Sequence, residues 1–322
     1  MAEAGQQPDN LGFDNRTEHN RKRTVNQDGS FNIIRKNDFL KEFHLYRWSI
    51  TCPWSHYWLA VLSVYVIINF SFAWIYYMLG PENIIGINPT REHPFWQCFF
   101  FSLQTYTTVG YGGLHPVGIM ANSMAGFEAF LGLMTFALAT GTLYGRFSKP
   151  TARIKYSPNA IIAPYRDHNA LMFMICNDSK GDLVEVTAQV NFSWVEEQAD
   201  GSMRRKFERL KLEFDKVNML ALTWTIVHPI DENSKLYSFS ASDFATKDVE
   251  IFILITVFDD SFSQTVHSRS SYMGKEIVYG AKFRLPFYVN DDGETVLDVH
   301  KVGDYDKVSL NQPASGSAGK IS

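Results

Sequence analysis

The chain is poor in cysteine and lacks the short motifs of the common enzyme classes. Its three cysteines, Cys52, Cys98 and Cys176, are odd in number and far apart, so they predict neither a disulfide framework nor a metal site. We expect them to be packing thiols. No H-E-x-x-H, G-x-S-x-G, C-x-x-C or G-x-x-x-x-G-K-S/T sequence occurs, which argues against zinc and serine hydrolases, against a thiol redox site and against a phosphate-binding loop. No cofactor, catalytic residue or nucleic-acid partner is expected.

The first thirty residues lack the apolar core of a cleavable signal peptide. They are rich in Gly, Asn, Gln and Asp and carry a basic cluster at residues 21–23. This polar composition predicts a disordered cytoplasmic tail over residues 1–34.

Two long stretches of the chain carry little or no formal charge. No Asp, Glu, Lys or Arg occurs from Trp54 to Leu79, which as a helix would be about 39 Å long and could cross about 30 Å of hydrocarbon. From Gly118 to Tyr144 the only formal charge is Glu128, and small and apolar residues dominate, as in closely packed membrane helices. Two membrane spans are therefore predicted.

The segments around the spans predict a third helix and an orientation. Pro94 suits the first position of a helix, and 95–107 is long enough for a short helix after it. Basic residues gather on the outer flanks of both spans, whereas the connection 80–116 has only Arg91. The positive-inside rule then places both termini in the cytoplasm. The flanking basic residues are Arg35, Lys36, Lys41, Arg47, Arg146, Lys149, Arg153 and Lys155.

An amphipathic segment precedes the first span. Phe39, Phe43, Tyr46 and Ile50 recur at steps of four, three and four, and charged residues occupy the other side. This spacing predicts a helix that lies along the inner membrane surface and ends before Pro53. A solvent-facing helix with the same stripe is the alternative.

The most specific motif is Thr108-Val109-Gly110-Tyr111-Gly112. A dehydrated potassium ion needs a stack of oxygens, which four extended backbones supply if successive carbonyls point at one axis. Such a backbone alternates between ordinary and left-handed dihedrals, and Gly110 and Gly112 can take positive φ. Val109 and Tyr111 would turn outward to pack behind it, and the Thr108 hydroxyl would add the innermost oxygens. The motif predicts a selectivity filter with potassium bound at Thr108, Val109, Gly110 and Tyr111.

The second half of the chain predicts an all-β domain. Seven short runs rich in Val, Ile, Phe, Tyr and Thr are separated by turn residues, which is typical of a β-sandwich. Its histidines are far apart, so a membrane-tethered enzyme is the least supported hypothesis. The runs are 171–176, 184–195, 207–214, 219–227, 249–258, 265–272 and 278–289.

Together these motifs resemble the inward-rectifier potassium channel family, and most closely its prokaryotic (KirBac) branch, over about residues 35–290. The resemblance rests on Thr107 to Gly112, and on Ala139-Thr140-Gly141 and 145–150 at the end of the second span. In the β domain it rests on 222–231, 267–272 and 276–280. It implies a homotetramer with an interfacial slide helix, two membrane helices, a pore helix and a cytoplasmic immunoglobulin-like sandwich. It also implies a second constriction in the loop 261–266, around Gln264.

Four departures limit what the resemblance implies. Gly113 replaces the Asp that commonly follows the filter, and Gln104 stands where many relatives have a Glu that braces it. Filter stability is therefore more in doubt than selectivity. The chain cannot form the extracellular disulfide of eukaryotic members with Cys98 alone. Phe136 occupies the position of an acidic residue in strong rectifiers, so steep polyamine block is not implied.

Spacing along the second span suggests a gate. Gly132, Phe136, Thr140 and Tyr144 are four residues apart and are expected on one face. In a tetramer Tyr144 would form a ring of aromatics at the cytoplasmic crossing, where the family has a constriction, and such rings can close a pore by dewetting. Gly132 is the expected bending point. Packing of this stripe against other helices is the alternative.

Charged residues near the membrane suggest two further roles. Arg47, Arg146, Lys149 and Arg153 are candidates for binding anionic lipid head groups, a phosphoinositide among them. A topology signal alone is the alternative. Glu128 is expected to be hydrogen-bonded behind the pore helix rather than to contact ions.

The sequence thus predicts a tail at 1–34, a slide helix and pore domain at 35–150, a cytoplasmic β-sandwich at 151–302 and a C-terminal tail at 303–322. We expect a homotetrameric, passively conducting potassium channel of a bacterial inner membrane, gated at the inner-helix crossing and modulated by anionic lipid. A weakly selective cation channel and a membrane-anchored sensor that does not conduct remain as alternatives.

Overall fold

The computed structural model describes residues 23–33, 44–88, 90, 93–148, 153–179, 181–198 and 201–311. Clustering of contacts divides the chain into a helical unit, 36–149, and a β unit formed by 150–322 together with 1–35. Each unit has a hydrophobic core of its own.

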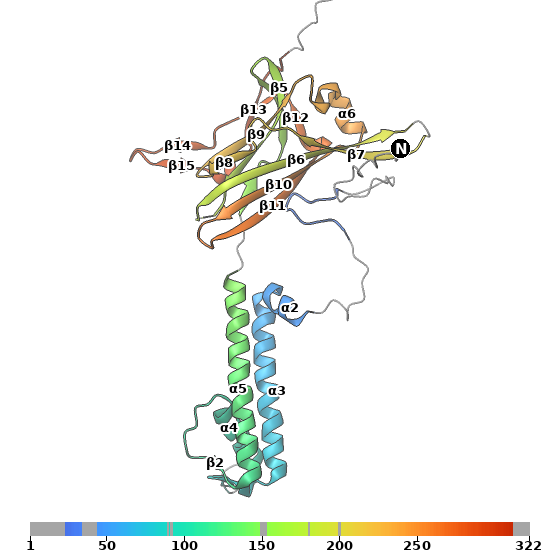
Figure 1. Cartoon of the computed structure of the whole chain (residues 1–322). Helices are drawn as coiled ribbons and strands as arrows, with labels where there is room; N and C mark the ends of the chain where they lie inside the picture. The colour runs from blue at the N-terminus through green and yellow to red at the C-terminus, as the bar shows by residue number, and fades with distance from the viewer. Residues whose placement is uncertain are drawn as a thin grey trace, which may run out of the picture. The chain divides into compact units, whose positions relative to one another are not determined.

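The helical unit contains the two long helices that the charge-free stretches predict. Figure 1 shows α3 (Trp54–Leu79) and α5 (Gly118–Phe147) side by side. Both are long and apolar enough to cross a membrane. α3 has the predicted bounds, and α5 continues past Tyr144 to Phe147. The two predicted spans are therefore confirmed as helices.

Two shorter helices complete this unit. α4 (Pro94–Tyr106) begins at Pro94 as predicted and packs against both long helices. α2 (Leu45–Thr51) ends before Pro53, which places Tyr46 and Ile50 in a helix, whereas Phe39 and Phe43 lie outside the described residues. The core between α3, α4 and α5 holds Phe72, Tyr76, Ile84, Cys98 and Phe101.

A two-stranded ribbon closes the loops at one end of these helices. β1 (Ile84–Ile85) pairs antiparallel with β2 (His115–Pro116), so the chain before α4 meets the chain just after the 108–112 motif. The Val117 N–H also donates to the Asn83 carbonyl at 2.8 Å. The motif is thereby tied at both ends, to α4 before it and to this ribbon after it.

The β unit is a sandwich of two five-stranded sheets, which confirms the predicted fold class. One sheet has the order β11-β10-β6-β7 with β8 on β6, and the other has the order β12-β4-β5-β3 with β9 on β5. The strands are β3 (Ile154–Tyr156), β4 (Ala160–Tyr165), β5 (His168–Asn177), β6 (Leu183–Glu197), β7 (Met203–Leu210), β8 (Lys216–Met219), β9 (Thr223–Ile230), β10 (Glu250–Asp259), β11 (Gln264–Met273) and β12 (Ile277–Tyr279).

Alternating apolar residues build the core of the sandwich. Ile253 on β10 pairs with Val190 on β6, and both side chains are buried. Because side chains alternate between the faces of a strand, every second residue of β6 and β10 points into the same core. Phe173 and Ile175 on β5 meet them from the opposite sheet.

The β domain departs from the predicted strand pattern in four places. The run 207–214 is shifted, since β7 begins at Met203 and ends at Leu210. The run 219–227 is two strands, because the chain bends at 221–222 between β8 and β9. The run 278–289 is three short strands, β12, β13 (Ala281–Phe283) and β14 (Phe287–Val289), separated at Gly280, where φ is 63°, and at Pro286. The sequence analysis did not predict β3, β4, β15 (Thr295–Leu297) or β16 (Tyr305–Lys307).

Residues 23–33 lie against the sandwich, so the prediction of a disordered tail is wrong for them. The Glu250 carboxylate is buried and accepts hydrogen bonds from the backbone N–H groups of Thr24 and Val25 at 2.9 and 3.3 Å. These partners are 226 and 225 residues apart in sequence, where no local pattern joins them. Residues 1–22 and 34 lie outside the described residues. Further contacts join Arg23 to Glu276 and Ser271 to Val25.

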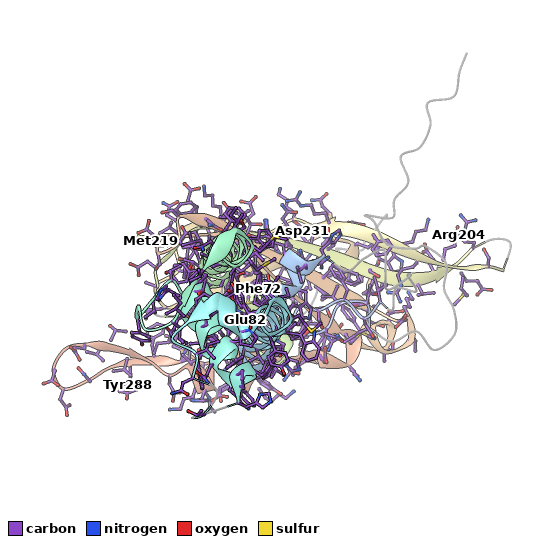
Figure 2. All side chains as sticks on the ribbon, turned by 90° about the horizontal axis from the view of Figure 1, so that it is seen from below. Phe72, Glu82, Arg204, Met219, Asp231 and Tyr288 are labelled. Atoms are coloured by element: carbon purple, nitrogen blue, oxygen red, sulfur yellow. The ribbon has the colours of Figure 1, made fainter. Side chains whose placement is uncertain are left out.

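The C-terminal tail predicted from residue 303 begins later. β16 pairs antiparallel with β13, and the Asn311 N–H donates to the Asn169 side-chain oxygen at 2.9 Å. The sandwich therefore continues to Asn311, and 312–322 lie outside the described residues. Figure 2 shows Tyr288 on the β14–β15 hairpin, which projects from the sandwich.

Candidate ion-conduction site

The 108–112 motif begins directly at the end of the pore helix α4. The Val109 and Gly110 N–H groups both donate to the Gln104 carbonyl, at 3.0 and 3.3 Å, and the Thr108 N–H donates to the Thr105 carbonyl at 3.0 Å. These bonds hold the start of the motif on the last turn of the helix. Gln104 holds the motif through its backbone carbonyl, so this contact does not depend on whether residue 104 is Gln or Glu.

The backbone of the motif has the predicted alternation. Its φ angles are 59° at Thr108, 51° at Gly110 and 84° at Gly112, while Val109 and Tyr111 between them have no positive φ. Only glycine adopts this region freely, and a β-branched residue there is strained. The Thr108 strain is typical of a functional site. The predicted positive φ values at Gly110 and Gly112 are confirmed.

Within one chain, the side chains of the motif are exposed and its glycines have no close neighbours. Val109 and Tyr111 are 53% and 80% exposed, so the expected packing behind the motif does not occur inside this chain. A Cβ built on Gly110 or Gly112 would meet no atom within 4 Å. The glycines are therefore required here by their φ angles and not by close contacts.

Glu128 joins the three helices behind the motif. It is fully buried and accepts hydrogen bonds from the Tyr76 hydroxyl of α3 at 2.7 Å and from the Ser102 hydroxyl of α4 at 2.5 Å. The Ser102 hydroxyl also lies 3.3 Å from the Asn69 side-chain oxygen. The expected structural role is supported, and sequence reasoning missed the partners because they lie on other helices.

Gly132 packs against the pore helix rather than joining the exposed face of α5. A Cβ there would lie 2.0 Å from the Tyr106 carbonyl oxygen. Steps of four residues also rotate by about 40° each, so Gly132 and Tyr144 are about 120° apart around the helix. The expectation that the whole stripe faces one way is therefore wrong for Gly132. α5 passes through Gly132 as one continuous helix.

The other gate candidates are exposed within one chain. Phe136 and Tyr144 are 75% and 73% exposed, and Thr140 is exposed as well. Thr135 and Phe136 also line a cavity of about 530 Å³ together with Thr107 and Thr108. Gln264, in the other unit, is exposed at the start of β11, where it pairs with Asp259 beside the β10–β11 turn.

Arg146 clamps α2 to the end of α5. Its Nη1 donates to the Ser49 carbonyl at 2.5 Å and its Nη2 to the Cys52 carbonyl at 2.7 Å. Its guanidinium carbon lies 4.3 Å from the Trp54 ring centroid and 4.9 Å from that of Tyr57. The side chain thus caps α2 and stacks on aromatic rings. This geometry argues against Arg146 as a lipid ligand, a correction that spacing alone could not supply.

The structure describes two of the three remaining lipid candidates. Arg47 and Arg153 are exposed. Lys149 lies outside the described residues. Arg47 and Arg153 are therefore open to a head group.

The three cysteines and His228 have structural roles. The three cysteines are buried and free of disulfides, which confirms them as packing thiols. Within the described ranges no three His, Cys, Asp or Glu side chains group as metal ligands. His228 is buried between the Lys211 carbonyl, 2.6 Å from Nδ1, and the Ser234 hydroxyl, 2.7 Å from Nε2. It is a core histidine.

Comparison with protein families decides the class of this molecule. A model described as the inward rectifier potassium channel C-terminal domain matches residues 154–319, and a model described as an ion channel matches residues 64–149. The first covers more than half of the chain. The chain belongs to the inward rectifier potassium channel family.

Individual relatives agree with this family. The inward rectifier potassium channel Kirbac3.1 of Paramagnetospirillum magnetotacticum is 31% identical over 87% of this chain and 94% of its own length. Inward rectifier potassium channel 18 of Homo sapiens is 29% identical over 84% of this chain and 69% of its own. ATP-sensitive inward rectifier potassium channel 12 of Bos taurus is 28% identical over 84% of this chain and 70% of its own.

The family assignment fixes the broad function. Its relatives are inward rectifier potassium channels, so this chain is a potassium channel and not an enzyme. It is a membrane protein with two helices able to span a bilayer. Among solved structures, a cohesin module from Clostridium perfringens has a TM-score of only 0.18 and 10% identity, over 41% of this chain and 99% of its own, and carries no argument.

Proposed function

We propose that four copies of this inward rectifier potassium channel chain assemble so that their 108–112 backbones surround one ion path. The observation that carries this is the alternation of positive φ at Thr108, Gly110 and Gly112. Alternating dihedrals turn successive carbonyls to one side, and one chain supplies only one wall of such a cage. Potassium would bind to the oxygens of Thr108, Val109, Gly110 and Tyr111 as the permeant ion, with no other cofactor.

Two features of the single chain favour assembly. Val109 and Tyr111 are exposed apolar side chains directly beside a strained backbone, and neighbouring subunits would cover them. The C-terminal end of α4, whose carbonyls carry partial negative charge, lies directly before the filter. It would stabilise a cation at the inner end of the path.

The gate is proposed at the cytoplasmic end of α5. Tyr144 and Phe136 are large, exposed residues of that helix, and four copies would form apolar rings that close the path by dewetting. Thr140, exposed between them, would line the same path. Gln264 is proposed for a second constriction in the sandwich. Bending of α5 at Gly132 would separate it from Tyr106, so this hinge would also move the pore helix.

The domain organisation and orientation follow from charge. The basic flanks of the two spans favour a topology with both termini in the cytoplasm, and we propose a bacterial inner membrane with the sandwich on its cytoplasmic side. Arg47, Lys149 and Arg153 are proposed to attract anionic lipid, a phosphoinositide included, and each cation near the leaflet contributes about 1 kcal/mol. Electrostatics predicts attraction but not the sign of the effect on conduction.

Flux from purified protein in liposomes tests the proposal. Potassium-dependent flux with a reversal potential that follows potassium in mixed potassium and sodium is expected. A reversal potential that follows both ions would support a weakly selective cation channel instead. Folded, tetrameric protein without any flux would support a non-conducting sensor.

The lipid proposal needs a separate measurement. The dose-response of flux to phosphoinositide in the liposomes should weaken in Lys149→Gln and in Arg153→Gln, with selectivity unchanged. Lys282→Gln, an exposed lysine of β13 in the sandwich, is the matched control for loss of one positive charge. A dose-response equal to that of the unmodified channel in both test variants would reduce these residues to orientation signals.

A further inference from the structure

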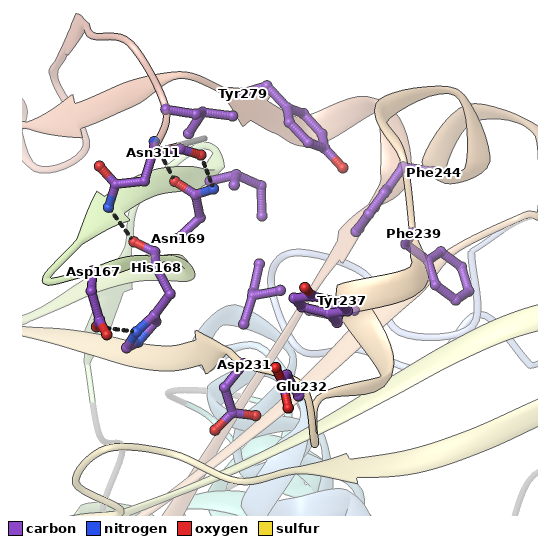
Figure 3. A pocket seen from close by; sticks show the side chains of 14 residues that line it. Asp167, His168, Asn169, Asp231, Glu232, Tyr237, Phe239, Phe244, Tyr279 and Asn311 are labelled. Carbon is purple, nitrogen blue, oxygen red and sulfur yellow. Dashed lines mark hydrogen bonds and ion pairs between the residues drawn. The ribbon is translucent and has the colours of Figure 1, made fainter. Parts of the chain in front are cut away.

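The sandwich contains a cavity that none of the residues proposed for conduction lines. Its volume is about 590 Å³, within the range of small-molecule sites. It lies where β4 turns into β5 and where β9 ends, beside the short helix η2 (Lys235–Ser238). Figure 3 shows that its walls come from segments distant in sequence.

One wall is a cluster of aromatic rings. Phe239 and Phe244 lie with ring centroids 5.8 Å apart, and Phe244 and Tyr279 lie 5.7 Å apart, both in edge-to-face contact. In Figure 3 the Tyr237 ring lies between these rings and the acidic side of the cavity. Faces of aromatic rings attract cations, most strongly where water is excluded. Apolar side chains of Ile162, Ile230, Leu236 and Leu310 complete this lining.

The opposite rim is acidic and has no Lys or Arg. Asp167, Asp231 and Glu232 line the cavity, and no Lys or Arg is among the lining residues. Adjacent carboxylates disfavour each other's charge unless a cation lies between them. Within the described part of the chain, the Glu232 carboxylate forms no hydrogen bond or ion pair, and the Asp231 carboxylate accepts only the N–H of Asn233. Asp231 and Glu232 therefore bring negative charge to the rim that no Lys or Arg of the described residues pairs with.

One lining nitrogen is also without a partner. The Nδ1 atom of His168 lies 2.8 Å from the Asp167 carboxylate. Its Nε2 atom is buried and forms no hydrogen bond in the described part of the chain. A buried polar atom of this kind normally bonds to water or a ligand.

The cavity is held open by side-chain amides. Asn169 donates to the Asn311 carbonyl at 3.0 Å, and the Asn311 amide donates to the carbonyls of His168 and Arg166 at 2.6 and 3.1 Å. Dashed lines in Figure 3 mark the Asn311 bonds to Asn169 and His168. These bonds fix the C-terminal segment as one wall. A preformed wall lowers the ordering cost of binding.

We propose that this cavity binds a small organic cation with an ammonium head and an apolar body. The carboxylates of Asp231 and Glu232 would face the ammonium group, and the rings of Tyr237 and Phe244 would cover its apolar side. An inorganic ion would leave the aromatic wall unused, and an anion would meet only like charge. The cavity thus favours an organic ammonium ion over an inorganic ion or an anion.

Choline and its uncharged isostere 3,3-dimethylbutan-1-ol test the proposal. Binding of each to the full-length protein in a detergent without choline groups is measured by saturation-transfer NMR at high potassium concentration. High potassium suppresses occupation of the ion path by choline. Choline is expected to bind about tenfold more tightly than the isostere, since shape is matched and only charge differs.

Variants locate the binding. Asp231→Asn combined with Glu232→Gln should weaken choline binding about tenfold, and Tyr237→Leu severalfold. Asp291→Asn combined with Asp292→Asn is the matched control, because it removes two adjacent exposed carboxylates from the β14–β15 turn and should change nothing. Equal binding of both probes, equal loss in the control, or no choline binding to the folded protein would overturn the proposal.

Discussion

At the residue scale, the proposed filter depends on glycine for one physical reason. Gly110 has φ of 51° and no atom within 4 Å of a Cβ position, so only the backbone angle forbids a side chain. In the left-handed region a Cβ costs about 1 kcal/mol or more. A tetramer would repeat that cost four times.

Gly110→Ala should therefore abolish potassium selectivity or conduction while assembly persists, as measured by reversal potentials and size-exclusion chromatography. Gly113→Ala is the matched control, because Gly113 has no positive φ and an equally open Cβ position. Normal selectivity in Gly110→Ala, or equal loss in both variants, would show that 108–112 does not form the filter.

A second residue makes the stability of the sandwich depend on pH. Burial lowers the pKa of His228 from its usual value of 6.5, against the opposing effects of the Lys211 carbonyl and Asp231. The unfolded chain then binds a proton at higher pH than the folded one. The contribution of His228 to stability is present above pH 6.5 and is lost as pH falls toward the folded pKa.

His228→Gln should flatten this pH dependence. Melting temperatures of the purified channel are compared between neutral and mildly acidic pH, where wild type should lose more stability than the variant. His300→Gln, an exposed histidine of the same domain, should behave as wild type. Parallel pH profiles for wild type and His228→Gln would rule out His228 as the source.

At the element scale, the sequence predicts best where an element is set by its own residues. α3 and α5 were predictable because a bilayer demands long uncharged runs, and α4 because Pro94 marks its start. The bend between β8 and β9 was not, because Leu220, Ala221 and Leu222 carry no turn residue, and Leu220 is itself buried in the core. β4 was missed because Pro164 weakens its strand pattern.

Contacts between elements were less predictable than the elements. The Arg146 clamp, the Glu128 network and the burial of Thr24 and Val25 each join residues from separate segments. A local pattern shows that Glu128 needs partners but not which helix supplies them. The alternation at Gly110 and Gly112 was predictable because it follows from the residues themselves.

Close packing of α5 on α4 gives a prediction for Gly132. A Cβ there would lie 2.0 Å from the Tyr106 carbonyl oxygen, which is backbone and cannot rotate away. Gly132→Ala should therefore force the two helices apart and destabilise the folded channel by about 1 to 3 kcal/mol. Thermal unfolding of the purified protein measures this loss.

Gly126→Ala supplies the control for this prediction. Gly126 lies on the same helix, and its Cβ would meet no atom within 4 Å. Alanine favours a helix over glycine by about 1 kcal/mol, so this variant should be as stable as wild type or more stable. Equal stability of Gly132→Ala and Gly126→Ala would mean that α4 and α5 pack differently in the assembled channel.

At the scale of the whole molecule, a single chain is an incomplete site. One chain supplies one wall of the proposed filter, and the side chains of Val109, Tyr111, Phe136 and Tyr144 are exposed. Each of these side chains would be exposed in a single chain if another copy covers it in the assembly or if it lines the shared ion path. The proposed gate is therefore a property of the assembly, and a substitution there should change flux without changing the fold of one chain.

Tyr144→Ala should raise resting potassium flux in liposomes, because four methyl groups restrict and dewet the path less than four aromatic rings. Selectivity should survive, since α5 separates Tyr144 from the filter by several turns. Leu138→Ala is the control: Leu138 is 71% exposed but lies about 200° around the helix from Phe136, so it should leave flux unchanged. Unchanged or lower flux in folded, tetrameric Tyr144→Ala would move the gate to Phe136 or to the loop around Gln264.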